Sequence, residues 1–234
     1  MGYGGRLCAG TVRFRLVARR TVWLPTFLGW SLLLLALGGS FLLWCIYGET
    51  FLSVTDRCPA DVLVVEGWIG PEGVKAAAME FARGNYRYVV GTGGLSGEPW
   101  HEERWNFAKE AGKVLRRVGI PADRVLVALT PDEADSQRTY AAALAVRRAL
   151  RDVGVSAKAL NIFTETDHAR RSRLVFEKVF EDGPCVGVVS WLPPGYDKGS
   201  WWRSSDRAVS FLKESVAYPF EKLFSSGRKS ASVP

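Results

Sequence analysis

The sequence is poor in the residue types that build metal sites. Its 234 residues include only two histidines and four cysteines, and these have none of the close spacings of zinc or iron–sulfur motifs. We therefore assign no metal ligand from sequence. An ion would have to be held by Glu66, Asp135 and His168, which lie in separate parts of the chain and would need the fold to bring them together.

Acidic residues are missing from the first 48 positions, which contain five arginines. The formal net charge of +7 is therefore concentrated near the N-terminus, and the rest of the chain carries almost as many acids as bases. No basic stripe with interleaved aromatic residues remains. The positive net charge therefore comes from the arginines near the N-terminus and does not indicate a nucleic-acid-binding surface, so we expect no nucleic-acid partner.

Charged residues are also absent from 27–47, a run long enough, at about 1.5 Å per residue, to cross a hydrocarbon core of about 30 Å. We predict a transmembrane helix over 24–47, after a cytoplasmic basic N-terminus over 1–23. Since the arginines precede the span, the positive-inside rule places the remaining chain outside the cytoplasmic (inner) membrane, in the periplasm or beyond. A cleavable signal peptide is the alternative, but no small-x-small cleavage site follows the run.

This topology divides the four cysteines between compartments. Cys8 would be cytoplasmic and Cys45 would lie in lipid, which leaves Cys58 and Cys185 in the exported domain. Oxidising conditions there allow a disulfide, but the sequence does not give the distance between the two residues. Two buried, unpaired cysteines are the other alternative, and we favour it.

Beyond a linker at 48–59, strand and helix patterns alternate through a domain at 60–224, which a polar tail at 225–234 follows. Apolar runs predict the strands and a period of 3.6 residues predicts the helices. Five strands, each followed by a helix, predict a parallel three-layer α/β sheet. The strands are expected at 61–66, 86–90, 124–129, 158–163 and 186–190; the helices at 71–83, 102–118 and 135–151, then one opening at 164–172 and one at 205–224.

Ligands of such sheets bind beyond the carboxyl ends of the strands, so the loops at those ends are considered together. Four of them carry polar or glycine-rich sequences, and His168, beside two arginines at a helix start, has the chemistry of an anion site. We predict Glu66 and His168 as catalytic. The predicted ligand-binding residues are Gly67, Trp68, Gly91, Thr92, Gly93, Gly94, Asp135, Arg138, Thr139, Thr166, Arg170, Arg171 and Trp202.

Each of these features has a simpler explanation. The glycines can serve the conformation of a turn, and Asp135 can cap a helix. The arginines at 170–173 can form a solvated helix face with His168 as a polar cap. The dinucleotide pattern G-x-G-x-x-G is absent from the glycine-rich loop, so no such cofactor is assigned.

The motifs VVEGW, GTGG, D-x-x-R-T-Y and T-x-x-H-A-R-R-S, in this order, resemble the DUF218 family, also called the YdcF-like (SanA/ElyC-like) family. The resemblance covers about 61–190 and extends toward Tyr218, and Glu214 also agrees with the pattern of the family. It implies a Rossmann-like domain, often tethered outside the cytoplasmic membrane and linked to envelope integrity and to peptidoglycan or lipid-carrier metabolism. The chain departs from the family where Glu66 and Trp68 replace a glycine-rich turn.

Three functions are compatible with these features. The first is an extracytoplasmic factor that acts on a phosphorylated envelope intermediate, such as a polyprenyl-phosphate lipid or a sugar phosphate. The second is a non-catalytic envelope scaffold or binding protein. The third, a nucleotide or S-adenosylmethionine binder, is disfavoured because those cofactors are cytoplasmic. The sequence leaves open whether the protein is an enzyme.

Overall fold

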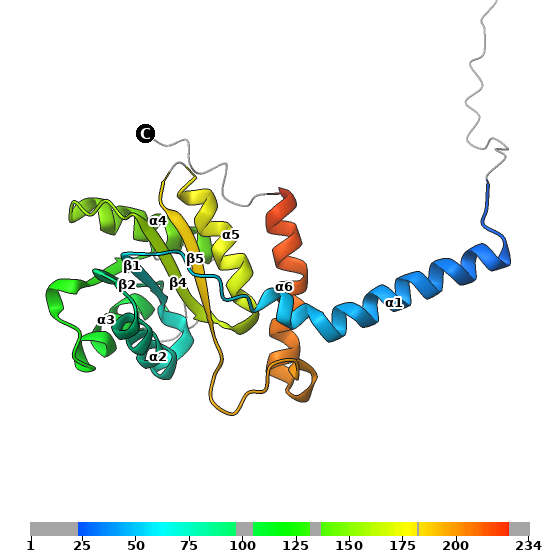
Figure 1. The fold of residues 1–234 in the computed structure, drawn as a ribbon, viewed down its shortest axis with the longest axis horizontal. Coiled ribbons are helices and arrows are strands. Elements are labelled where there is room, and N and C mark those ends of the chain that lie inside the picture. Colours follow the sequence, from blue (N-terminus) through cyan, green and yellow to red (C-terminus); the bar gives the residue numbers. More distant parts are fainter. Residues whose placement is uncertain (1–22, 97–104, 132–136, 182, 225–234) are drawn as a thin grey trace, which may run out of the picture. The chain divides into compact units, whose positions relative to one another are not determined.

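The structure is a computed structural model that describes residues 23–96, 105–131, 137–181 and 183–224. The chain divides into two compact units, Met1–Phe41 and Leu42–Pro234. Helix α1, Phe27–Leu52, begins in the first unit and ends in the second (Figure 1). The predicted N-terminus and tail lie outside the described residues, except for Trp23.

Helix α1 is long and apolar enough, by length and composition, to cross a membrane. It has 26 residues, and its most apolar stretch has a mean hydropathy of 1.9 with no residue buried inside the protein. The helix continues past the predicted end of the span because Gly48, Glu49 and Leu52 pack in the second unit. There the carboxylate of Glu49 accepts hydrogen bonds from the hydroxyl of Tyr196 and the backbone N–H of Gly199.

Five parallel strands form one sheet, which confirms the predicted fold class. The strands are β1 (Val62–Glu66), β2 (Tyr88–Gly93), β3 (Val125–Leu129), β4 (Ala159–Glu165) and β5 (Cys185–Trp191), in the order β3-β2-β1-β4-β5. All four strand pairings are parallel, which is the Rossmann-like arrangement (Figure 1). The predicted strand 86–90 was wrong at its end, because three of the glycine-rich loop residues belong to β2.

Two pairs of helices cover the sheet. Helices α2 (Gly70–Arg83) and α3 (Phe107–Arg117) pack with one core cluster, and α4 (Arg138–Asp152) and α5 (Ala169–Val179) pack with the other. Helix α3 begins later than predicted because the Asn106 side chain caps it, accepting from the N–H groups of Ala108 and Lys109. The last helix, α6 (Ser205–Phe224), lies outside these layers and packs against α5.

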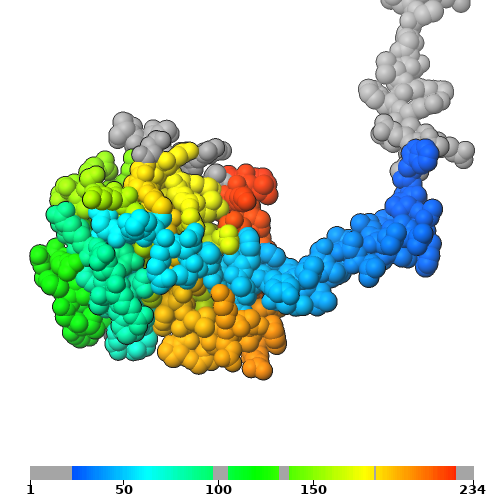
Figure 2. All heavy atoms as spheres, in the orientation of Figure 1, coloured from blue at the N-terminus to red at the C-terminus, as the bar shows by residue number. Residues whose placement is uncertain are grey.

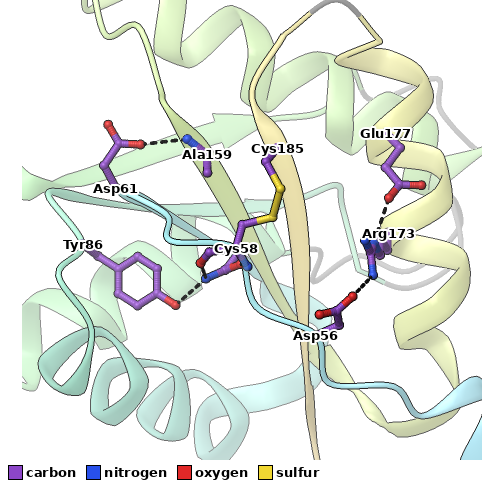
Figure 3. Close-up of a disulfide and its surroundings, with 9 residues drawn as sticks. Asp56, Cys58, Asp61, Tyr86, Ala159, Arg173, Glu177 and Cys185 are labelled. Atoms are coloured by element: carbon purple, nitrogen blue, oxygen red, sulfur yellow. Dashed lines mark hydrogen bonds and ion pairs between the residues drawn. A yellow bond between two sulfur atoms is a disulfide. The ribbon is translucent and has the colours of Figure 1, made fainter.

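The segment between α1 and β1 is fastened to the edge of β5. Asp56 pairs with Val188 in an antiparallel bridge, and Cys58 forms a disulfide with Cys185 (Figure 3). The expectation of two unpaired cysteines was therefore wrong, because the bridge at Asp56 carries Cys58 onto the start of β5. Gly187 makes this possible, since a Cβ atom there would lie 2.5 Å from the backbone nitrogen of Cys58. In Figure 2 this segment, coloured light blue and cyan, lies across the surface of the second unit.

Candidate functional site

The candidate site lies between the carboxyl ends of β1 and β4. These two strands are neighbours at the centre of the sheet, and from them the chain winds outward in opposite directions, to β2 and β3 on one side and to β5 on the other. Such a switch point is where open α/β sheets usually bind ligands. Glu66 ends β1, and a single turn of 3₁₀-helix, Thr166–His168, follows β4.

Glu66 is a buried carboxylate with three hydrogen-bond donors. Its side chain accepts from the hydroxyls of Thr164 and Ser172 and from the indole nitrogen of Trp68, while only 2% of the residue is exposed. Buried carboxylates are costly unless their oxygens are satisfied in this way. The strand end, the start of α5 and the loop after β1 together hold this group in one orientation.

His168 lies between two buried carboxylates. Its Nδ1 atom is 2.9 Å from Oε1 of Glu214, and its Nε2 atom is 3.6 Å from Oε2 of Glu66. The ring of Trp68 meets the imidazole edge-on, with 5.1 Å between the centroids. Glu214 can only accept, so its contact is a hydrogen bond when Nδ1 carries a proton, whereas Nη2 of Arg171, 3.0 Å from the same atom, can only donate and bonds to Nδ1 when it carries none. In the neutral ring that has its proton on Nδ1, Nε2 is the atom that can take up a proton.

Glu214 is held as a carboxylate by Arg171. Nε and Nη2 of Arg171 donate to the two carboxylate oxygens over 2.6 and 2.8 Å. Burial alone would raise the pKa of Glu214, but the hydrogen bonds from Arg171 and His168 outweigh it and lower the pKa to about 2. At neutral pH this group is therefore ionised, as an orienting partner of an imidazole must be.

A second group of buried polar residues lies beside this cluster. Asp167 accepts from the hydroxyls of Ser210 and Thr166, and Glu165 pairs with Arg207 over 3.0 Å. Burial raises the pKa of both Asp167 and Glu165, although these partners oppose the shift. Thr166 has a φ of 37°, a left-handed conformation that is strained for a β-branched residue, and such strain is found preferentially at functional sites.

The structure brings some of the predicted site residues together with Glu66 and His168. Trp68 and Arg171 contact them directly, and Thr139 accepts a weaker hydrogen bond of 3.4 Å from Arg171. Thr166 lies in the same turn as His168. Thr92 pairs with Glu66 across the sheet, but its hydroxyl bonds to carbonyls of β3 and α4 instead.

The predicted glycines have packing roles in this structure. A Cβ atom at Gly67 would lie 2.3 Å from the carbonyl oxygen of Phe107, and one at Gly91 would lie 3.1 Å from Cβ of Ala111. Both glycines therefore allow α3 to approach the strand ends closely. Gly93 and Gly94 are likewise crowded, by Phe107 and Thr130.

Other predicted residues lie elsewhere. Arg170 donates to the carbonyl of Phe51 over 2.6 Å and stacks on its ring, so it joins α5 to the end of α1. Trp202 is exposed in the turn before α6 and contacts Trp201. Arg138 is exposed at the first residue of α4, with no hydrogen bond or ion pair to any other described residue. Asp135 lies outside the described residues.

Three residues of the cluster were not predicted as site residues: Thr164, Ser172 and Glu214. Thr164 and Ser172 stand in the motif region around His168, and their burial beside Glu66 depends on the sheet register. A signal for Glu214 is its position one helical turn after Phe211, on the face of α6 opposite the regularly spaced apolar residues Val209, Leu212 and Val216.

No three histidine, cysteine, aspartate or glutamate side chains among the described residues are arranged to hold a metal ion. The arrangement instead fits proton transfer, since an imidazole oriented by one carboxylate faces a second. No family model, curated protein or solved structure matches this chain.

Proposed function

We propose that this chain is a single-pass protein of the cytoplasmic membrane whose α/β domain acts outside it in cell-envelope biogenesis or integrity. The domain would bind a phosphorylated ligand, a polyprenyl phosphate or a sugar phosphate, at the carboxyl edge of the sheet. The observation that carries the proposal is the placement of His168 between Glu214 and Glu66 at the switch point. The resemblance to DUF218 proteins supports the envelope setting.

Two features support the location. The arginines precede an uncharged helix, which favours a cytoplasmic N-terminus. The disulfide between Cys58 and Cys185 is of the kind that forms in oxidising compartments outside the cytoplasm. A periplasm-only reporter fused after Pro234 should be active, and activity of a cytoplasm-only reporter in its place would refute the location.

The chemistry proposed for the site is general acid–base catalysis. Nε2 of His168 would take a proton from a hydroxyl group or water that attacks the ligand, and would return it to the departing oxygen. Glu214 stabilises the protonated ring through Nδ1, and Glu66 faces the proton on Nε2. Arg138, which is exposed and unpaired among the described residues, is one cation available to a phosphate at this edge.

A non-catalytic binding protein is the second candidate, and it is favoured because the charged groups of the cluster are already paired with one another. Both oxygens of Glu214 already bind Arg171, and Arg170 is engaged by Phe51, so neither of these predicted phosphate ligands is free. In this case the buried charge cluster would serve to hold α5 and α6 together beside a binding surface.

Purified full-length protein in lipid nanodiscs would separate the two candidates. We expect it to convert a polyprenyl-phosphate-linked sugar, detected by mass spectrometry, and the His168→Gln variant to be inactive while it remains folded. The matched control is Arg173→Gln, because Arg173 is on the same helix but pairs with Asp56 and Glu177, away from the cluster (Figure 3). Binding of the ligand without conversion by the unmodified protein would favour the binding protein.

A further inference from the structure

Helix α6 has two faces of unexpected composition. The face that packs on the protein carries Phe211 and two acids, Glu214 and Glu221. The opposite face carries a stripe of large apolar residues that the other described residues of the second unit leave exposed. The stripe consists of Val209, Leu212, Val216, Phe220 and Leu223, which are 65, 55, 70, 53 and 74% exposed.

The stripe is regular and continuous. Its members follow one another at spacings of three or four residues, so they form one face of the helix. From Val209 to Leu223 this face is about 21 Å long at 1.5 Å per residue. Soluble proteins rarely leave an apolar surface of this extent without a partner.

The end of α1 fixes where this helix lies. The indole nitrogen of Trp44 donates to the hydroxyl of Ser215 over 2.9 Å, and the rings of Phe51 and Tyr218 are 5.7 Å apart. Trp44 belongs to the uncharged run that ends just before Glu49. The middle of α6 is therefore level with the last turn of the apolar segment. Figure 2 shows the orange start and red end of α6 at the surface of the second unit, on either side of the last residues of α1.

The surroundings of the stripe match a lipid–water interface. Trp202 is exposed directly before α6, and the neighbouring Trp201 donates to the backbone carbonyl of Cys45 in α1. Lys213 and Lys222 are exposed on α6, and their long side chains can reach lipid phosphates beside a buried apolar face. Aromatic and basic residues of this kind are typical where membrane helices meet the headgroups.

We propose that α6 lies in the plane of the membrane, with the stripe from Val209 to Leu223 inserted at the interface of the leaflet that α1 leaves. The inference rests on the membrane location in the proposed function. It adds a second attachment, which fixes the orientation of the domain on the bilayer. Since Glu214 is on the opposite face of the same helix, the His168 site would be held at a set height above the lipid headgroups.

Environment-sensitive fluorescence in the full-length protein tests this inference. In a background with Cys8 and Cys45 changed to serine, a single cysteine replaces Leu212 or Val216 and is labelled with a nitrobenzoxadiazole dye. We expect blue-shifted emission in nanodiscs, and loss of most of the fluorescence when brominated lipids are used. The matched control is Met79→Cys, which is 56% exposed on α2 and should give water-like emission unaffected by brominated lipids.

The outcomes separate this inference from the membrane location itself. A label at Leu34, in the uncharged part of α1, reports whether the anchor is in lipid. Quenching at Leu34 together with water-like emission at Leu212 and Val216 would refute the in-plane helix, while the transmembrane anchor would still be supported. If the label at Leu34 is not quenched, the anchor itself is not in lipid, and the membrane location in the proposed function is refuted. If the blue-shifted emission at Leu212 and Val216 disappears in nanodiscs that hold a single protein chain, a second copy of the chain covers the stripe. That result would contradict the inference.

Discussion

Nδ1 of His168 and Oε1 of Glu214 are 2.9 Å apart, although 46 residues separate them in the chain. This contact joins the turn after β4 to a helix that lies outside the layers of the sheet. Helix α6 contributes a charged group to the centre of the site while its opposite face is apolar and exposed. The chemistry at the switch point therefore depends on how α6 is seated.

The first prediction concerns the stability contributed by Glu214. The Glu214→Gln variant leaves Arg171 charged and 16% exposed without its ion pair, and we expect it to lower the free energy of unfolding by about 3 kcal/mol. The control is Glu177→Gln, because Glu177 pairs with Arg173 at the surface, where ion pairs contribute about 1 kcal/mol or less. Denaturant unfolding of full-length protein in detergent measures both. Equal effects would contradict the buried role of Glu214.

The second prediction is a pH dependence with a defined sign. The pKa of Glu214 is lowered to about 2 in the folded protein, against 4.5 without its partners. Its stabilising contribution is therefore fully present above about pH 4.5 and is lost as the pH falls toward 2. The raised pKa values of Asp167 and Glu165 act in the opposite direction, so the difference between the unmodified protein and Glu214→Gln is the quantity to follow. That difference should shrink below pH 4.5, and a constant difference would refute the assignment.

The third prediction concerns the disulfide. It closes a loop of 127 residues and holds the segment after α1 on β5, so changing Cys58 and Cys185 to serine should cost about 2 to 5 kcal/mol. Thermal unfolding of full-length protein with and without reductant measures the loss, and reductant should have no effect on the double variant. A thiol reagent applied to unfolded, unreduced protein from cells should label Cys8 and Cys45 only. Labelling of Cys58 would contradict the pairing.

The fourth prediction separates two adjacent arginines. Arg171→Ala should destabilise the fold by about 3 to 5 kcal/mol, because it leaves Glu214 buried without its cation. Arg170→Ala removes a hydrogen bond and a ring contact to Phe51 near the surface and should cost about 1 kcal/mol. Neither arginine is expected to grip a phosphate directly. A stable Arg171→Ala variant that has lost only ligand binding would restore the role predicted from sequence.

The sequence was sufficient for the features that depend on local pattern. The alternation of apolar runs and amphipathic helices was enough to predict the parallel sheet. The position of Glu66 and His168 after predicted strands was enough to place both residues at the carboxyl edge of that sheet. Their closeness follows because β1 and β4 are neighbours at the switch point. The motif at the start of α5 led to Arg170 and Arg171 as ligand-binding residues, and of these two only Arg171 contacts His168.

Features that depend on packing between distant segments could not be predicted. Glu214 reaches His168 only because α6 docks on α5, and Cys58 reaches Cys185 only because the linker crosses the edge of β5. Arg170 and Arg171 are equivalent in sequence, yet the 100° turn between helix neighbours directs one to Phe51 and the other to Glu214. The glycines after β1 and in β2 resembled a ligand-binding loop in sequence. The close approach of α3 to these strand ends requires glycine at the same positions.

The last prediction tests His168 as the group that moves a proton. Positioned acid–base groups contribute about 10² to 10⁴ in rate, so His168→Gln should lower turnover of a polyprenyl-phosphate-linked sugar by at least 10²-fold, with ligand binding largely kept. Glutamine can still bond to Glu214, so folding should be retained and can be checked by thermal unfolding. Trp68→Phe is the matched comparison, because it keeps an aromatic ring near His168 and loses only the bond to Glu66, and its rate should fall by much less.

In cells, the His168→Gln variant should fail to complement envelope stress in a strain lacking the protein, at a protein level equal to that of Arg173→Gln. Full complementation by folded His168→Gln would remove the catalytic proposal and leave a binding protein of the envelope.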